Sequence, residues 1–254
     1  MIAAGLLLVA VGAVDLLRQM VRSRRWIAFA AAAVALVLVS AALDAVIAGL
    51  LAVAVAAIWT WVVPEDGPAR AGLWPVALLA LAAAACVVIA PGRARPGLLG
   101  AAWATYSPGN AVSIDVVVLV IGCLVFLLES GNAVVRIALR SEMGGRVELN
   151  TRPVASGTAP VGVDAAAPVA PAPGLKGGRL IGPLERILVF VLTLTGAYTL
   201  LAAVLAAKGI VRFPEISRDR DDGDRAEYFL IGSLVSWVTA LAAAFLVWWG
   251  VRAG

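Results

Sequence analysis

One short stretch of the sequence carries side chains that could do chemistry inside an apolar segment. In VLVIGCLVFLLESGNAVVRIALR, Glu129, Asn132 and Arg136 follow at helical spacing, which places them on one face of a helix. A carboxyl group at mid-bilayer costs about 2.5–3.5 kcal/mol on insertion scales, so Glu129 should face protein or water. Two interpretations stay open: a protonated or paired acid that hydrogen-bonds across a bundle, or an acid on a conduction or proton-relay path.

The rest of the composition limits the catalytic chemistry open to the chain. Its 254 residues contain no histidine, which removes the usual general base near neutral pH, the usual zinc ligand and the imidazole-centred triads. Cys86 and Cys123 lie within apolar runs, where thiols are usually inert packing residues. We therefore expect no catalytic residue, no cofactor and no metal site.

The elements that must position these residues are membrane helices. The chain is 62% hydrophobic and 14% charged, with a mean hydropathy of +0.98, whereas about 25% of residues are charged in soluble domains. Because a span needs about 20 apolar residues, the sequence predicts an all-α, polytopic helical integral membrane protein of about seven spans. The candidate runs are 2–17, 26–43, 45–63, 73–90, 114–139, 184–207 and 229–250.

Two stretches leave the span count open, between six and eight. Residues 26–63 form one apolar block, and a single helix of that length would measure about 57 Å against a hydrocarbon core of about 30 Å. We expect two short spans that turn near Asp44, with Asp15 and Asp44 at the membrane interface. Residues 97–113 are too short and too interrupted to cross, so they should be interfacial or re-entrant.

The distribution of positive charge sets the expected orientation. No positive residue precedes the first apolar run, which is followed directly by Arg18, Arg22, Arg24 and Arg25. This order is the reverse of a cleavable signal peptide, so the first helix should be retained with its N-terminus outside. Threading seven spans from that start places most of the twenty Lys and Arg residues on the cytoplasmic side and predicts a cytoplasmic C-terminus.

A change of composition divides the chain into two membrane parts. Residues 142–178 are rich in proline, alanine and glycine and lack a sustained hydrophobic period, so they should form a flexible linker. The linker separates a predicted five-span helical bundle, 1–141, from a predicted two-span hairpin, 179–254.

The two helices of the predicted hairpin carry small residues at every fourth position. Such stripes let helices approach closely in lipid, where burial of apolar surface gives no net drive. We therefore expect the two spans to pack antiparallel along these stripes. They consist of Thr195, Thr199 and Ala203 on one helix and of Gly232, Ser236 and Ala240 on the other.

Charged residues concentrate around the loop of this hairpin. Lys208 leaves one helix where Glu227 enters the other, so opposite charges should converge at one membrane interface above a solvated loop. The acids within the loop lack the spacing of a calcium-binding loop. The expected interfacial cluster consists of Glu185, Arg186, Lys208, Arg212 and Glu227.

Three blocks of the hairpin carry a family resemblance. GRLIGPLERIL, KGIVRF and AEYFLIGSLVS occur in order at 178–188, 208–213 and 226–236. They resemble the C-terminal membrane hairpin of an uncharacterised bacterial and phage family of integral membrane proteins, a domain of unknown function, with the pattern G-x-L-I-G-x-L-E-R, K-S-I-x-R-F, E-Y-x-L-I-G-T-L-x-S. This chain departs from the pattern at Gly209 and Ser233, and it lacks the histidine typical of the family's N-terminal half. The resemblance implies a shared module in a bacterial inner membrane and no known activity.

Three functional hypotheses from different classes follow. The first is a non-enzymatic membrane scaffold or signalling component that meets a protein partner at the linker or the charged loop. The second is a small transporter or channel organised around Glu129, which would need a water-filled polar path from several spans. The third, an intramembrane enzyme, has only scattered Ser, Asp and Glu to work with. For all three hypotheses we expect contact with the lipid bilayer and no binding of nucleic acid.

Overall fold

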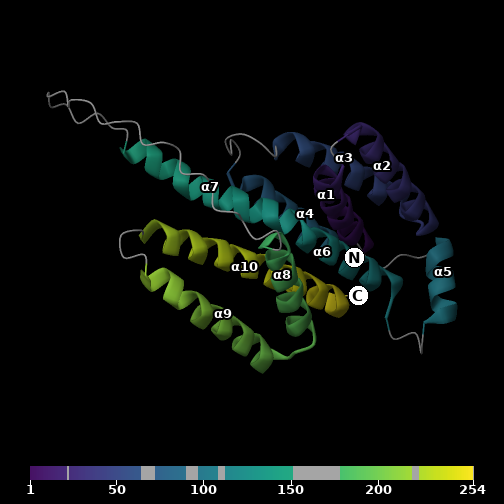
Figure 1. The fold of residues 1–254 in the computed structure, drawn as a ribbon. Coiled ribbons are helices and arrows are strands. Elements are labelled where there is room, and N and C mark those ends of the chain that lie inside the picture. Colours follow the sequence, from purple (N-terminus) through teal and green to yellow (C-terminus); the bar gives the residue numbers. More distant parts are fainter. Residues whose placement is uncertain are drawn as a thin grey trace.

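The computed structural model shows an all-helical protein, as predicted (Figure 1). It describes residues 1–21, 23–63, 72–89, 97–107, 112–150, 178–218 and 223–253, and no strand occurs within these ranges. The helices are α1 (Ile2–Met20), α2 (Arg25–Ala42), α3 (Val46–Val62), α4 (Trp74–Ile89), α5 (Gly97–Tyr106), α6 (Ile114–Leu128), α7 (Ser130–Asn150), α8 (Gly178–Leu194), α9 (Tyr198–Arg218) and α10 (Gly223–Ala253).

Several of these helices can cross a membrane. By length and composition α1, α2 and Phe229–Arg252 of α10 qualify, and α6 with α7 adds a fourth if that bent pair is one span. Shorter apolar helices, Val46–Val62, Trp74–Ile89 and Tyr198–Val211, could add to the count. A 17-residue helix is about 25 Å long, close to the hydrocarbon thickness of about 30 Å.

The distribution of side chains is that of a protein whose solvent is lipid. Large apolar side chains point outward, with Trp61 85% and Ile47 77% exposed, whereas Asp15, Glu129 and Arg186 are at most 6% exposed. In water such exposed apolar surface is unfavourable, but in a bilayer it faces hydrocarbon while ionisable groups turn toward the protein interior. Burial and composition together therefore support the membrane-protein class.

Helix α1 lies at the centre of the bundle, where it packs against α6, α3, α4 and α2. Two of its glycines let its backbone approach that of α6. A Cβ atom on Gly5 would lie 2.7 Å from the Val118 carbonyl, and one on Gly12 would lie 2.8 Å from the Phe126 nitrogen. Residue numbers rise together along this contact, so α1 and α6 run parallel, with the close approach that small residues permit in lipid.

The apolar block 26–63 turns where the sequence predicts. Helix α2 ends at Ala42 and α3 begins at Val46, and Asp44 between them has a φ of 54°. Asp is one of the few non-glycine residues that adopt this left-handed conformation readily. The prediction of two short helices is confirmed. In the segment 97–113 the chain forms the ten-residue helix α5, which is too short to cross, and its interfacial position stays a prediction.

The predicted single span over 184–207 is wrong. Helix α8 ends at Leu194, α9 begins at Tyr198, and Gly196 between them has a φ of 70°, which glycine adopts without steric cost. The chain reverses there, so α8 and α9 form a hairpin of their own (Figure 1). The stripe predicted on this span is exposed and does not form the expected interface. Its members are Thr195, Thr199 and Ala203.

The small residues of α10 pack, but against other helices than predicted. Ser236 and Ala240 are buried, and Gly232 faces Val135 and Leu139 of α7. Helix α10 lies against α8, α7, α6 and α4, so the C-terminal part of the chain completes the bundle begun by the N-terminal part. Helix α7 continues to Asn150, into the predicted linker, and the rest of that linker up to 177 lies outside the described residues.

Both termini lie at the same end of the bundle (Figure 1). Gly232 faces Leu139 whereas Gly250 faces Leu119, so α10 runs antiparallel to α6 and α7. A Cβ atom on Gly250 would lie 3.5 Å from the side chain of Met1. The prediction that the termini lie on opposite membrane faces is therefore wrong, because the chain reverses once more than the hydropathy pattern indicates, at Gly196.

Candidate functional site

The predicted span 114–139 breaks at Glu129. This residue ends α6 with φ −127° and ψ −42°, and α7 starts at Ser130 with its axis bent by 48°. Sharp bends are typical of Gly/Ser pairs, and Ser130 and Gly131 form such a pair here. The carbonyl groups in the last turn of α6 lose their intrahelical partners, so other groups must bond them.

The Glu129 side chain is buried against α1 and α7. Its Oε1 atom accepts a hydrogen bond from Nε2 of Gln19 at 2.5 Å, and its Oε2 atom accepts one from Nδ2 of Asn132 at 3.3 Å. The structure thus brings Asn132 to Glu129, as the spacing predicts. Arg136, predicted on the same face, is exposed, and the cation that bonds Asn132 comes from another helix.

That cation is Arg186 of α8, which is 1% exposed. Its Nε donates to the Leu127 carbonyl at 2.8 Å, and its Nη2 donates to Oδ1 of Asn132 at 2.7 Å. Its Nη1 lies 3.5 Å from Oγ of Ser236 on α10. Glycine is needed at position 131, since a Cβ atom there would lie 2.5 Å from the Arg186 Nε. The predicted interfacial place of Arg186 is therefore wrong: it satisfies the carbonyl that the break exposes.

A second carboxylate, Asp15 of α1, lies beside the same break. The Ser130 hydroxyl donates to its Oδ2 at 2.6 Å, and the Trp59 indole donates to the same oxygen at 3.1 Å. Arg18 forms an ion pair with Oδ1 at 3.4 Å. Asp15 is 6% exposed and thus buried among the helices, and its predicted level at the membrane interface stays a prediction. It connects α1, α3 and α7 inside the protein.

Arg18 also caps the C-terminal end of α3. It donates to the Thr60 carbonyl at 2.5 Å and to the Val63 carbonyl at 2.9 Å. The last carbonyls of a helix lack partners, and a cation there meets the negative end of the helix dipole. The contact also places Val63 at the opposite end of α1 from Met1, as two helices within 26–63 require.

Together these groups form one buried polar network around the break. Two acids and two bases, Asp15, Glu129, Arg18 and Arg186, are joined by polar side chains of α1, α7 and α10. Both carboxylates accept hydrogen bonds, and both guanidinium groups donate to backbone carbonyls. Within the described ranges no group of three or more Cys, Asp or Glu is placed to hold a metal ion.

The network includes Gln19, which the sequence did not single out, and it gives Asp15 and Arg18 roles other than those predicted from their positions. Asp15, Arg18 and Gln19 lie in the last turns of α1, at spacings of three and four that place them on one side of an otherwise apolar helix. That spacing is a signal that could have predicted a polar site. The part played by Arg186 has no local signal, because its partners lie more than fifty positions away in the sequence.

A separate polar cluster joins the α8–α9 hairpin to α10. The Lys208 ammonium lies 2.5 Å from both carboxylate oxygens of Glu185, and the Trp237 indole donates to Glu185 Oε1 at 2.7 Å. Lys208 therefore pairs within the hairpin. The side chain of Arg212 lies outside the described residues, so its predicted cluster with Glu227 stays a prediction.

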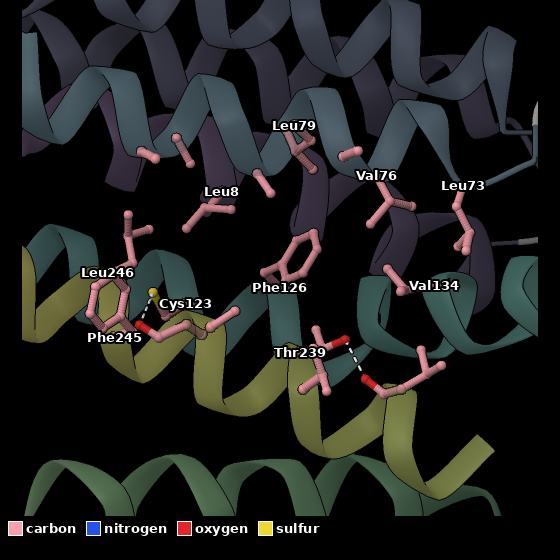
Figure 2. Close-up of a pocket in the computed structure, with 18 of the residues that line it drawn as sticks. Leu8, Leu73, Val76, Leu79, Cys123, Phe126, Val134, Thr239, Phe245 and Leu246 are labelled. Atoms are coloured by element: carbon pink, nitrogen blue, oxygen red, sulfur yellow. Dashed lines mark hydrogen bonds between the residues drawn. The ribbon is translucent and has the colours of Figure 1, made fainter. Parts of the chain in front are cut away.

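An apolar groove of about 740 Å³ runs between α4 and α10 (Figure 2). Val76 and Leu79 of α4 project into it from one wall and Phe245 of α10 from the other, while Cys123 and Phe126 of α6 line its floor. The residues of the buried polar network do not line this groove. The described chain therefore holds two distinct features, a polar interior and an apolar lateral groove.

Comparisons of the chain with protein-family models, with curated proteins and with solved structures give no significant match. The resemblance of the hairpin blocks to a membrane family therefore stays an expectation from the sequence.

Proposed function

We propose that the protein is a non-enzymatic scaffold or signalling component of a bacterial inner membrane. The observation that carries this proposal is the closed character of the buried polar network, in which Asp15, Glu129 and Arg186 bond to one another's helices. Ionisable groups inside a membrane protein otherwise mark substrate or ion pathways. Here they join six helices, α1, α3, α6, α7, α8 and α10, in one arrangement, and the groove between α4 and α10 is apolar. Both properties suit a rigid body that meets partners at its surfaces.

The partner surface we propose is the end of the bundle opposite the termini. The end of α7, the end of α9 and the start of α10 all lie there, because α8 and α9 form a hairpin (Figure 1). The linker follows α7 and the charged loop follows α9, and the described ends of these two helices lie at the same end of the bundle (Figure 1). A protein partner could engage both segments at once.

The distribution of positive charge favours that face as the cytoplasmic one. Among the described residues, Arg252 lies at the end with both termini, whereas Arg18, Arg24 and Arg25 lie at the other end of α1. Positive residues concentrate in cytoplasmic loops, so we infer that both termini lie outside.

Site-specific photocrosslinking in cells tests the scaffold proposal. A crosslinker at Pro160 in the linker and one at Arg220 in the charged loop should capture the same protein, because α7 and α9, which lead into these segments, end at the same end of the bundle (Figure 1). A crosslinker at Ala253, at the other end of the bundle, should not capture it. If neither Pro160 nor Arg220 yields an adduct while the protein is present at its normal level, the scaffold proposal fails.

A second candidate is a small transporter organised around Glu129. The observation that favours it is the break between α6 and α7, where Glu129 and the Asp15 side chain of α1 lie close to the broken ends. Discontinuous helices form ion and substrate sites in transporters. Proton flux into liposomes that carry an imposed pH gradient tests this candidate. Flux above that of empty liposomes that disappears with Glu129→Gln supports transport, and flux equal to that of empty liposomes excludes proton conduction.

A further inference from the structure

We propose that the groove between α4 and α10 binds one acyl chain of an anionic phospholipid, whose phosphate lies at Arg252. The lipid comes from the leaflet that surrounds the two termini. This inference is independent of the scaffold proposal, since it concerns the opposite end of the bundle and a membrane lipid in place of a protein.

The lining of the groove fits hydrocarbon and offers little to a polar ligand. Among its polar side chains, Thr239 donates its hydroxyl to the Val235 carbonyl at 2.7 Å, and the Cys123 thiol lies 3.8 Å from the Ala243 carbonyl (Figure 2). Both groups thus bond to the protein's own backbone. A ligand that carried hydrogen-bonding groups along its length would lose its bonds to water without replacing them.

The dimensions of the groove fit a single chain better than a helix. Its walls extend from Leu73 to Val88 on α4 and from Leu234 to Trp249 on α10, about 22 Å at 1.5 Å per residue. One leaflet contributes about 15 Å of hydrocarbon, so an acyl chain fits within this length. Helices α4 and α10 approach to within 8 Å between Cα atoms, which leaves no room between them for a helix about 10–12 Å wide.

The end of the groove near the termini has the features of a headgroup site. Trp249 lines the groove there, and the neighbouring Trp248 stacks on Phe245 at a centroid distance of 5.6 Å. The Arg252 guanidinium lies 4.3 Å from the centroid of the Trp248 ring. Trp residues concentrate at the level of lipid headgroups, and guanidinium groups bind phosphate through paired hydrogen bonds. The charge of Arg252 therefore selects an anionic lipid.

Two neighbouring alanines of α4 provide a matched pair for the test. Ala84 lines the groove and Ala85 does not, although both are exposed, so a tryptophan at either position should permit folding. The full chain, freed of lipid in detergent, is titrated with phosphatidylglycerol or phosphatidylcholine, and bound lipid is counted by native mass spectrometry. We expect wild type to bind phosphatidylglycerol about tenfold more tightly than phosphatidylcholine, a difference of about 1.4 kcal/mol.

The variants test the binding of the acyl chain and the recognition of the headgroup separately. Ala84→Trp should lose the bound lipid and Ala85→Trp should keep it. Arg252→Gln should bind both lipids equally, and Arg252→Lys should keep part of the preference for phosphatidylglycerol. Equal lipid binding by Ala84→Trp and Ala85→Trp would overturn the proposal, as would equal binding of the two lipids by wild type. A dimer of wild type that Ala84→Trp converts to monomer, with lipid binding unchanged, would assign the groove to a second copy of the chain.

Discussion

At the scale of single residues, Arg186 connects the two parts of the chain. Burial of a guanidinium group in a membrane protein is costly, and the structure offsets this cost with the Leu127 carbonyl and the Asn132 amide oxygen, near the charge of Glu129. The bonds reach from α8 to the break between α6 and α7. The side chain therefore holds the C-terminal part in register with the N-terminal part.

Replacement of Arg186 should be among the most destabilising changes in the chain. Arg186→Met removes the cation and leaves buried Glu129 without its counter-charge, at an expected cost of about 3–5 kcal/mol. Arg186→Lys should also destabilise, since an ammonium group lacks the planar fork that bonds two acceptors at once. The exposed Arg136→Met is the matched control and should change the free energy of unfolding by less than about 0.5 kcal/mol. Equal stability of the Arg186→Met and Arg136→Met proteins in detergent would contradict the role given to Arg186.

Gly131 allows Arg186 to lie across the break. In Gly131→Ala the new Cβ atom would overlap the guanidinium group, and overpacking of this kind costs about 1–3 kcal/mol. Gly209 in α9 is the control, because a Cβ atom there meets nothing within 4 Å. Gly209→Ala should be neutral or stabilising by up to about 1 kcal/mol, since alanine is the better helix former. Thermal unfolding of both variants measures the contrast, and a Gly131→Ala protein as stable as wild type would refute the packing argument.

At the scale of elements, the sequence predicted the helices better than their breaks. The turn at Asp44 could be predicted because 38 apolar residues are too long for one span. The breaks at Glu129 and Gly196 could not, since each lies in a run of nearly the right length for a single crossing. A hydropathy profile reports the apolar character of a segment, and it carries no information on a glycine with left-handed backbone angles. The hydrogen-bond partners of Arg186 could not be predicted either, because they depend on which helices pack against each other.

The α8–α9 hairpin should depend on the ion pair between Glu185 and Lys208. Its side chains are 14% and 23% exposed, so removal of either charge should cost about 1–3 kcal/mol. The swap Glu185→Lys with Lys208→Glu should recover only part of this loss, because the Trp237 indole loses its acceptor. Double-mutant cycles of the unfolding free energy measure the coupling. If the double mutant Lys208→Glu with Glu227→Lys recovers the lost free energy of unfolding instead, Lys208 pairs with Glu227 across the charged loop.

At the scale of the whole molecule, the α8–α9 hairpin decides the topology. A single crossing over 184–207 would place the charged loop and the linker on opposite faces and leave positive charge on both. The hairpin instead brings the ends of α7 and α9 to the same end of the bundle, opposite the termini and Arg252 (Figure 1).

Fusion reporters test this topology directly. Reporters at residues 1 and 254 should be active only outside the cytoplasm, because Met1 lies beside Gly250. Reporters at residues 68 and 220 should be active only inside, since α3 ends and α10 begins at the opposite end of the bundle (Figure 1). The control is a reporter at residue 93, which should behave like the two termini. A cytoplasmic reporter at 254 together with an external one at 1 would contradict this topology and support a single membrane crossing over 184–207.

The central position of α1 has a consequence for how the protein is made. This helix leaves the ribosome well before its partner, because Ser130, which bonds to Asp15, follows 115 positions later. At about 5–20 residues per second, α1 waits for that partner for roughly 6–23 s in the translocon or in lipid. During this interval Arg18, three positions along the same helix, can neutralise Asp15. The nascent helix thus carries its own counter-ion, and replacement of Arg18 alone should impair insertion of the newly made chain before it affects the finished fold.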